Sequence, residues 1–418
     1  MARKGKRPDN MITLTAKAKI TDISDQDALC LSMIGYFATK LWNVANMNRN
    51  AAWSDTGKIP SFYDQCKSMK DNRWCKLLPS QTSQEILAEL DDSYRSWYKL
   101  RKNGDKKARP PGYRRKTELS TVTFKQNAFA MVAPDQVELR LPSDIDRESI
   151  RLSFILPNKV RLGLVKQVKL TYASSTGDWY LHITHWQTIS YRNTGNVMAL
   201  DLGIVNIIAG IISTGQSFII PGGELLALDR YFQKEKAKCS KSSSKRCRRL
   251  NHLWSVQRNH YLHAISKRIV EIALSNNVST IVIGDLKGIR QDKNWGDRGN
   301  QKLHAWPFEK LIQLIAYKAA LAGIRVIKVS ERNTSTTCPV CGKRSKSARI
   351  QRGLFLHCGQ AYNADLVGAW NILQRYLQSV GQPALGVVGA LARPAVNLFV
   401  WRKTTPLGRE QGTFKQAA

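Results

Sequence analysis

The feature that most constrains this chain is an apolar stretch that ends in a single acidic residue. Residues 197–202 read Val-Met-Ala-Leu-Asp-Leu, and Gly203 follows directly. A continuous apolar run of this kind predicts a strand that is buried on both faces, as in an α/β sheet. Open α/β sheets bind their ligands at the carboxyl ends of such strands. Asp201 is therefore a candidate site residue, although an ordinary buried strand with an acid at its exposed tip has the same pattern.

Two further segments carry an acid at a comparable position. A second apolar strand, predicted over residues 280–284, leads directly to Asp285, and Asp365 lies at the start of a helix predicted from residue 363 onward. Three acids from three distant segments, two on strands and one on a helix, are typical of an RNase H-like metal nuclease. Carboxylates suit such a site because Mg²⁺ prefers oxygen ligands, and two ions stabilise the attacking and leaving oxygens when a phosphodiester is cleaved in line.

The charge of the chain predicts a polyanionic partner. Its 418 residues, enough for two or three domains, include 65 Lys and Arg against 31 Asp and Glu, a formal net charge of +34. Nucleic acid is the natural partner of such a surface. No stretch reaches the roughly 18 to 20 uninterrupted apolar residues that a membrane helix needs, and the basic N-terminus lacks the apolar part of a signal peptide. We therefore expect no membrane partner.

Two basic segments are candidates for contacts with phosphate groups. Residues 101–116 are interrupted by the helix-breaking sequence Pro-Pro-Gly, and a second cluster falls in a helical stretch expected over residues 225–276. Either segment could be a solvated surface, but dense cations repel one another unless an anion compensates them, which favours binding to a nucleic-acid backbone. The candidate residues are Arg109, Arg114, Arg115, Lys116, Lys234, Lys238, Lys241, Lys245, Arg246, Arg248 and Arg249.

The N-terminal half predicts strands around a helical insertion. Residues 11–20 alternate between apolar and polar side chains, residues 25–100 have the apolar spacing of helices, and residues 119–188 return to strands. This order suggests a small β-barrel with an inserted helical unit. Four tryptophans of the insertion are expected in its core rather than as platforms for stacked bases: Trp42, Trp53, Trp74 and Trp97.

A cysteine pair near residue 340 predicts a metal-binding knuckle. Cys338-Pro-Val-Cys341 is a strong half-site, because tetrahedral Zn²⁺ accepts two thiolates from such a turn. The second half offers only His357 and Cys358, which are adjacent and can hardly both reach one ion without strain. Either zinc is held by Cys338, Cys341, Cys358 and a neighbour such as His357, or the segment folds without metal. Eight cysteines in the whole chain suggest metal rather than disulfides, and a reducing compartment.

These motifs resemble those of the TnpB family, transposon-encoded RNA-guided DNA nucleases that are related to type V CRISPR effectors. The resemblance covers roughly residues 197–373, with the segments around Asp201, Asp285, Cys338 and Asp365 in the order of the family. It implies a prokaryotic, cytoplasmic, nucleoid-associated endonuclease of the RuvC type that holds a guide RNA, as a monomer or dimer on the RNA. It also implies cleavage of the target double-stranded DNA, with two Mg²⁺ ions. In such systems base pairing reads the sequence, while the protein reads a short flanking motif.

The resemblance also divides the chain into domains. The expected fold is an α/β RNase H-like (RuvC) nuclease domain, preceded by a wedge-like β-barrel with a helical recognition insertion, and carrying a small zinc-ribbon-like insertion. The barrel takes residues 1–24 and 113–195, the recognition lobe 25–112, the nuclease 196–330 (parts I and II) and 365–380 (part III), the target-nucleic-acid-binding zinc ribbon 331–364, and a C-terminal tail 381–418.

One position departs from the family pattern. Where the family has a catalytic Glu before the Asp of its second motif, this chain has Gly284, and because strand side chains alternate, Asp285 should point away from the place of that Glu. Glu331 is the candidate replacement, since it follows a strand predicted over residues 324–330. A βαβ connection makes this strand the parallel neighbour of the strand that contains Gly284. Glu331 could instead cap the following turn or pair with Arg332.

The sequence therefore predicts Asp201, Glu331 and Asp365 as catalytic residues and Mg²⁺ ligands, with Asp285 as a further catalytic candidate. The function predicted is an RNA-guided DNA endonuclease. The alternative is an RNA-guided DNA-binding protein with a disabled nuclease, which would act as a repressor or targeting factor.

Overall fold

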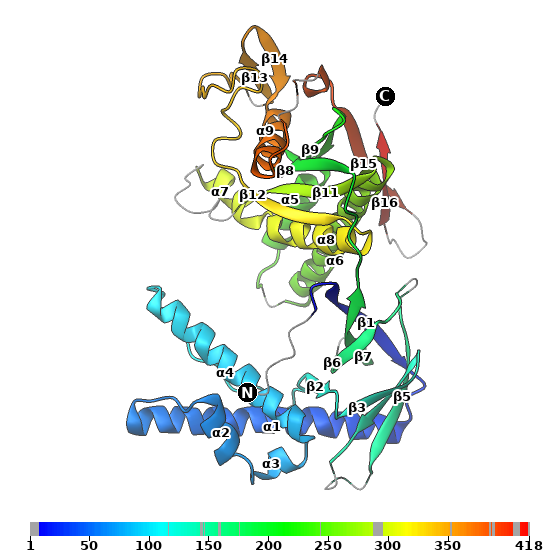
Figure 1. The fold of residues 1–418 in the computed structure, drawn as a ribbon. Helices are drawn as coiled ribbons and strands as arrows, with labels where there is room; N and C mark the ends of the chain where they lie inside the picture. The colour runs from blue at the N-terminus through cyan, green and yellow to red at the C-terminus, as the bar shows by residue number, and fades with distance from the viewer. Residues whose placement is uncertain are drawn as a thin grey trace. The chain divides into compact units, whose positions relative to one another are not determined.

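The chain divides after Thr188 into two units, Met1–Thr188 and Ile189–Ala418. The computed structural model (Figure 1) describes residues 8–403 and 410–416, with the exception of residues 116, 143, 144, 146, 158, 159, 175, 243, 287–295, 352, 384, 385, 387 and 388. Lys116, one of the predicted phosphate contacts, lies outside the described residues. Among the helices that are described, none is long and apolar enough to cross a membrane.

An antiparallel sheet is the main element of the first unit. Its seven strands have the order β2-β6-β7-β1-β5-β4-β3. They are β1 (Met11–Thr21), β2 (Val122–Lys125), β3 (Phe129–Ala133), β4 (Gln136–Arg140), β5 (Ser149–Ile155), β6 (Leu164–Ala173) and β7 (Asp178–Thr188). Ala16, Ala18 and Ile20 of β1 alternate with exposed side chains and are buried in the core. Strands β2 and β3 are the two edges of this sheet and do not pair with each other among the described residues. A closed barrel therefore stays a prediction.

A helical insertion separates β1 from β2. It consists of α1 (Asp25–Thr56), α2 (Phe62–Ser68), α3 (Arg73–Lys76) and α4 (Ser80–Lys102). Helix α1 begins after Ser24, whose hydroxyl accepts a hydrogen bond from the N–H of Asp27, and ends at Gly57 in the left-handed conformation. The helices share one hydrophobic core with the sheet. Within it, Arg49 of α1 and Asp91 of α4 form a buried ion pair at 3.0 Å.

The tryptophans of the insertion differ in burial. Trp42 is buried, and Trp74 and Trp97 are partly buried against the core. The prediction that Trp53 belongs to the core is wrong, because 39% of this residue is exposed. The buried residues of α1 end at Arg49, so Trp53, one helical turn further on, lies beyond the part of the helix that the core covers.

A mixed sheet is the centre of the second unit. Its seven strands have the order β12-β11-β8-β9-β10-β15-β16. They are β8 (Asn196–Asp201), β9 (Asn206–Ile212), β10 (Ser217–Pro221), β11 (Val278–Asp285), β12 (Arg325–Ser330), β15 (Ala395–Lys403) and β16 (Glu410–Gln416). Strands β8, β11 and β12 are parallel neighbours, and β8, β9 and β10 are antiparallel. The segment predicted as a C-terminal tail thus contributes two strands, with β15 parallel to β10.

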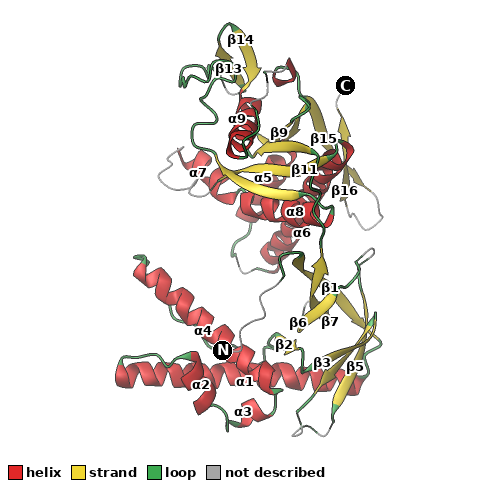
Figure 2. Cartoon of the chain, in the orientation of Figure 1, coloured by secondary structure: helices red, strands yellow, loops and turns green. Residues whose placement is uncertain are grey.

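Helices cover both faces of this sheet (Figure 2), which explains why its central strands are mostly apolar. The helices are α5 (Gly223–Ala237), α6 (Lys245–Ser275), α7 (Gly296–Ala305), α8 (Phe308–Leu321) and α9 (Ala364–Ser379). Met198 and Leu200 of β8 share a core with α6 and α8. Val197 and Ala199, which point to the opposite face, share a second core with α9. A short hairpin, β13 (Leu354–His357) and β14 (Gln360–Asn363), leads into α9.

Candidate nuclease site and zinc-binding knuckle

The parallel strands of the second unit bring predicted site residues to one edge of the sheet. Asp201 is the last residue of β8, Asp285 is the last residue of β11, and Glu331 directly follows β12. Helix α9, which packs on the same sheet, presents Asp365 in its first turn. We call Asp201, Glu331 and Asp365 the nuclease site.

Burial and neighbouring acids raise the pKa values of Asp201 and Glu331. Burial, followed by the charge of Asp365, raises the pKa of Asp201 to about 7. Burial, followed by the charges of Asp201 and Asp285, raises the pKa of Glu331 to about 8. Desolvation and like charges both disfavour the ionised form. Ionisation of Asp201 and Glu331 is therefore unfavourable, and a bound cation would offset that cost.

The absence of a side chain at Gly284 makes room for Glu331. Strands β11 and β12 pair in parallel, with Gly284 opposite Val329. A Cβ atom added to Gly284 would overlap Oε1, Cγ and Cδ of Glu331. The Glu331 side chain therefore lies over Gly284, reaching across from the neighbouring strand.

The oxygen atoms of this site fit a divalent cation. Oε1 of Glu331 is buried and has no hydrogen-bond partner among the described residues. A buried carboxylate oxygen without a partner is costly unless an ion or another donor compensates it. Carboxylate oxygens are also the ligands that Mg²⁺ prefers. The residues of the nuclease site thus have the chemistry that a magnesium site requires.

Asp285 has a different environment from the three residues of the nuclease site. It is exposed, whereas Asp201, Glu331 and Asp365 are each partly buried. It pairs in register with Ser330, and its charge contributes to the raised pKa of Glu331. Asp285 therefore lies near the site but at its solvent side.

Contacts from three segments hold Asp365 in position. Asn363, the N-cap of α9, accepts hydrogen bonds from the backbone N–H groups of Asp365 at 3.0 Å and Leu366 at 3.3 Å. Nδ2 of Asn206 donates to Oδ2 of Asp365 at 2.8 Å. Nη2 of Arg349 forms an ion pair with Oδ1 of Asp365 at 2.9 Å. Both carboxylate oxygens are thus oriented by the protein itself.

Glycine in α9 lets the helix approach the end of β8. A Cβ atom added to Gly368, one turn after Asp365, would overlap Oδ2 of Asp201. This close approach of α9 to β8 explains how Asp365 of the helix and Asp201 of the strand reach one site.

Arg349 and Asn206 are site residues that sequence reasoning missed. Arg349 lies between the two halves of the cysteine motif, beside the buried Ala348, and 37% of its side chain is exposed. The carbonyl of Ala348 accepts a hydrogen bond from the N–H of Leu356 at 2.7 Å, which ties this segment to β13. No local pattern distinguishes Arg349 from the other basic residues nearby, because only the fold brings Asp365 to it.

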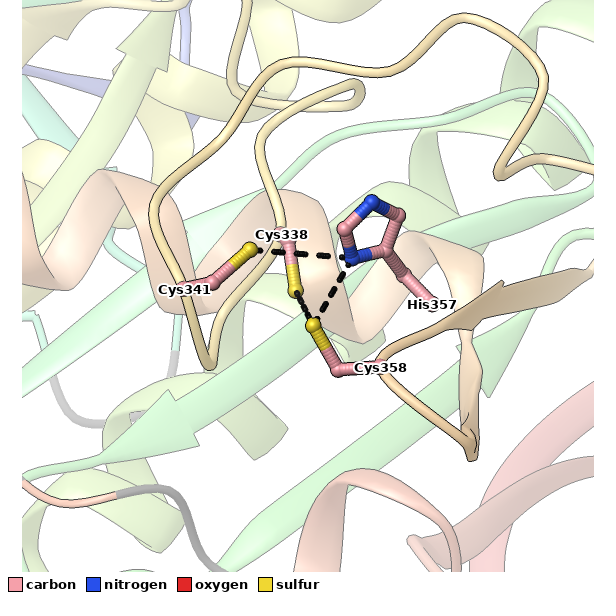
Figure 3. Close-up of side chains that lie close together, drawn as sticks. All are labelled: Cys338, Cys341, His357 and Cys358. Atoms are coloured by element: carbon pink, nitrogen blue, oxygen red, sulfur yellow. Dashed lines mark hydrogen bonds between the residues drawn. The ribbon is translucent and has the colours of Figure 1, made fainter.

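The four predicted zinc ligands come together in one knuckle, the zinc knuckle (Figure 3). The ligand atoms of Cys338, Cys341, His357 and Cys358 all lie within 4.8 Å of one another. Nδ1 of His357 is 3.7 Å from Sγ of Cys341 and 3.1 Å from Sγ of Cys358. Sγ of Cys338 is 4.0 Å from Sγ of Cys358. Tetrahedral zinc with Zn–S bonds of about 2.3 Å spaces its sulfurs by roughly 3.8 Å, so this set fits the ion.

A turn allows the adjacent His357 and Cys358 to face the same point. Cys358 has a φ of +51°, in the left-handed region, and Gly359 follows with a φ of +74°. An extended backbone would direct neighbouring side chains to opposite sides. The backbone of this turn therefore brings both side chains to one point, with the non-glycine residue Cys358 in the left-handed region.

The basic candidates of the first unit fall into two groups. Arg114 is half-buried, with its guanidinium 3.9 Å from the centroid of the Trp42 ring and 3.7 Å from Glu89. Burial lowers the pKa of Arg114. Arg109 and Arg115 are exposed. Arg114 thus has a structural role in the insertion, while the other two are available at the surface.

The basic candidates of the second unit lie on α5, α6 and their connection, and all are exposed. We call them the basic cluster. Glu235 forms ion pairs with Lys238 at 2.5 Å and with Arg246 at 3.2 Å. The other members form no ion pair among the described residues: Lys234, Lys241, Lys245, Arg248 and Arg249. These five retain uncompensated charge.

Two family descriptions match the second half of the chain. "Probable transposase" matches residues 183–290, and "Cas12f1-like, TNB domain" matches residues 308–372. The first range contains Asp201 and Asp285, and the second contains Glu331, Asp365 and the zinc knuckle.

Curated relatives share parts of this sequence. "CRISPR-associated endodeoxyribonuclease Cas12f1" of Sulfoacidibacillus thermotolerans is 29% identical over 46% of this chain, and the match spans about half (49%) of that relative. "Putative RNA-guided DNA endonuclease InsQ" of Escherichia coli K12 is 26% identical over 76% of this chain and 79% of the relative. "TnpB-like protein MJ0751" of Methanocaldococcus jannaschii is 27% identical over 47% of this chain and 74% of the relative.

A solved structure shares the fold. The protein in a Cas12f1-sgRNA-target DNA complex is 13% identical, with a TM-score of 0.61 that covers 87% of this chain and 99% of that one. Together with the motifs around Asp201, Cys338 and Asp365, the family descriptions and the curated relatives confirm the resemblance that the sequence indicated: the chain is similar to the TnpB-like proteins and to the Cas12f1 CRISPR-associated endodeoxyribonucleases.

Proposed function

We propose that this protein is an RNA-guided DNA endonuclease that hydrolyses target DNA at the nuclease site. One observation carries the proposal: Glu331 lies over Gly284 and completes a set of three acids with Asp201 and Asp365. The names of the relatives, an endodeoxyribonuclease and an RNA-guided DNA endonuclease, support the guided activity. A disabled nuclease is less well supported, because Glu331, which follows the neighbouring strand, lies over Gly284 and can replace the acid missing there.

Asp201, Glu331 and Asp365 would hold the Mg²⁺ ions. When bound, two such ions stabilise the attacking and leaving oxygens of an in-line phosphodiester hydrolysis. Asn206 keeps Asp365 in a fixed orientation through its hydrogen bond to Oδ2. Arg349, which is partly exposed beside Asp365, can offer its guanidinium to a phosphate oxygen of the DNA strand, for which its fork of donors is suited.

The other parts of the chain would bind the nucleic acids. We assign the first sheet to the wedge-like domain, the helices α1–α4 to the recognition lobe, and residues 331–364 to target binding. The charge of +34 supports partners that are polyanionic, a guide RNA and double-stranded target DNA. In this proposal the protein acts as a monomer or dimer on its RNA, in the cytoplasm beside the nucleoid.

The test is guided cleavage by the purified protein. The RNA that copurifies is sequenced, and DNA complementary to its variable part, flanked by randomised sequence, is incubated with the complex and Mg²⁺. We expect cleavage by the wild type and none by Asp201→Asn, which retains shape but loses charge, with DNA binding retained by both. A wild type that binds this DNA without cutting it would refute the endonuclease and favour the repressor.

We predict that the basic cluster binds the backbone of the guide RNA or of the heteroduplex. Replacing Lys245, Arg248 and Arg249 by Gln should weaken RNA binding and reduce the slope of log K against log[salt] by about 2 to 3, because each lost phosphate contact removes about 0.7 to 0.9. Binding titrations at several salt concentrations measure both quantities.

The matched control replaces Lys238 and Arg246 on the same surface. Because both already pair with Glu235, their loss should change the salt slope by less per residue than the loss of the unpaired cations. An unchanged affinity and slope in the triple variant would show that the basic cluster is only a solvated surface.

A further inference from the structure

A hollow of about 690 Å³ opens in the first unit beside the C-terminal parts of α1 and α4. Its lining includes Trp53, Tyr94, Trp97 and Tyr98. The ring centroids of Trp53 and Trp97 are 5.1 Å apart at an angle of 61°, and Tyr94 meets Trp97 edge-on at 6.1 Å. Trp53 is 39% exposed and Tyr98 is 63% exposed. The hollow therefore presents aromatic surface to solvent.

Helical spacing explains why these rings meet. Tyr94, Trp97, Tyr98 and Arg101 stand at positions i, i+3, i+4 and i+7 of α4, so they share one face of the helix. Trp53 comes from α1, one turn after Arg49 at the end of the core. Both helices thus continue past the core and carry aromatic side chains beyond it.

Positive charge accompanies the aromatic wall. Four lining residues are cationic, namely Arg49, Arg95, Lys99 and Arg101, against one carboxylate, Asp91. Asp91 is already engaged by Arg49 at 3.0 Å and by Arg95 at 2.8 Å. Lys99 forms no ion pair with any residue that the structure describes. The rim therefore has an excess of cations that an apolar peptide would leave uncompensated.

Exposed rings beside uncompensated cations suit a nucleotide. The flat face of any base stacks on aromatic side chains, and its phosphate pairs with Lys or Arg, which together make a binding site for single-stranded nucleic acid. An unpaired RNA segment offers its bases without loss of pairing, whereas a base in duplex DNA must first be unpaired and unstacked. RNA is accordingly the better occupant.

We propose that this hollow binds one unpaired nucleotide of the guide RNA. The base stacks on Trp53 and Tyr98, and the phosphate lies against Lys99 and Arg101. This inference rests on the proposed function for the identity of the RNA, and it adds a base-binding pocket in the helical insertion.

The first test locates the contact. The full-length protein is mixed with a synthetic single-stranded RNA of mixed sequence, irradiated with ultraviolet light and digested, and the peptides that carry nucleotide adducts are identified by mass spectrometry. We expect adducts on Trp53, Trp97 or Tyr98. Adducts confined to other peptides would overturn the proposal.

The second test separates stacking from charge. Trp53→Leu and Tyr98→Leu should each weaken binding of this RNA by about 5- to 150-fold, the range for the loss of one base–aromatic stack, and leave the salt slope unchanged. Trp53→Phe should restore most of the affinity. The pair Lys99→Gln and Arg101→Gln should instead lower the salt slope by about 0.7, the value for the loss of one phosphate contact of a single strand.

The control is Tyr63→Leu, which removes a 51% exposed ring from the same insertion outside the hollow. An equal effect of Tyr63→Leu and Trp53→Leu would refute the pocket. Unchanged binding of the copurified RNA by Trp53→Leu and Tyr98→Leu, with weakened binding of single-stranded DNA, would refute the assignment to the guide RNA. Guided cleavage by the wild type is measured separately and tests the proposed function. If the wild type cuts DNA but Trp53→Leu and Tyr98→Leu bind RNA as tightly as the wild type, this inference is contradicted and the proposed function is not.

Discussion

Replacing Glu331 by Ala or Gln will reduce guided DNA cleavage by at least about 10²- to 10³-fold, the effect typical of losing one preorganised electrostatic group in an active site. Asp201→Ala and Asp365→Ala will have effects of the same order, because two remaining acids would hold the metal ions loosely. Binding of guide and target should persist, since these substitutions leave the basic surfaces proposed to bind the nucleic acids unchanged. Single-turnover cleavage assays and DNA-binding titrations on the same samples measure both.

Asp285→Ala is the matched control for these variants. Asp285 is an acid at the same sheet edge, but it is exposed and lies one position beyond Gly284. We expect a change of only a few-fold, far below the electrostatic loss above. Full activity of Glu331→Ala, or loss with Asp285→Ala alone, would refute the assignment of Glu331.

Position 284 offers a second way to test the same assignment. In Gly284→Ala the new methyl group would overlap the Glu331 carboxylate, so this variant should lose cleavage although it removes no acid. The double variant Gly284→Glu, Glu331→Ala moves the carboxylate to the neighbouring strand and should recover part of the activity that Glu331→Ala loses. Gly223→Ala serves as the control, since a Cβ there meets no atom within 4 Å.

Removing zinc from the zinc knuckle will abolish cleavage through loss of local structure. We expect about one equivalent of zinc per chain, because four ligand atoms lie within 4.8 Å of one another. The binding free energy of a structural zinc, about 10 to 16 kcal/mol in small metal-folded domains, is also the free energy that folds the segment. Cys338→Ser and Cys341→Ser should therefore lose the metal and unfold residues 338–363 locally.

The consequence for cleavage follows from the position of the knuckle. Its segment carries Arg349, which pairs with Asp365, and ends at Asn363, which caps α9. Arg349→Gln should therefore lose cleavage while it retains zinc, and Cys338→Ser should lose both. Metal analysis, local hydrogen exchange and cleavage assays distinguish these outcomes.

Cys239→Ser is the control, since Cys239 directly follows the C-cap of α5 and lies outside the zinc knuckle. It should keep both metal and activity. Less than about half an equivalent of zinc, together with unaltered folding after chelation, would show that the zinc knuckle folds without the metal.

Local patterns in the sequence were sufficient to predict the main elements of the second unit. The apolar run before Asp201 predicted a strand buried on both faces. The prediction is confirmed, because helices cover both faces of the sheet at this strand. The strand–helix–strand order from β11 through α8 to β12 predicted parallel neighbours, and this pairing brings Glu331 over Gly284. These inferences succeed because side-chain alternation and βαβ connections are properties of adjacent residues and consecutive elements.

Other features were decided only by contacts between segments that are distant in the sequence. Asn206 and Arg349 reach Asp365 from 159 and 16 residues away, and no local pattern marks either residue. Trp53 is a large aromatic residue of the type expected in a core, but the buried part of α1 ends one turn before it. The sequence by itself therefore determined the strands that lead to Asp201, Asp285 and Glu331 and the positions of these acids. Only the tertiary structure decided which polar groups orient those acids and which aromatic rings stay exposed, because burial and pairing depend on the neighbours that folding brings together.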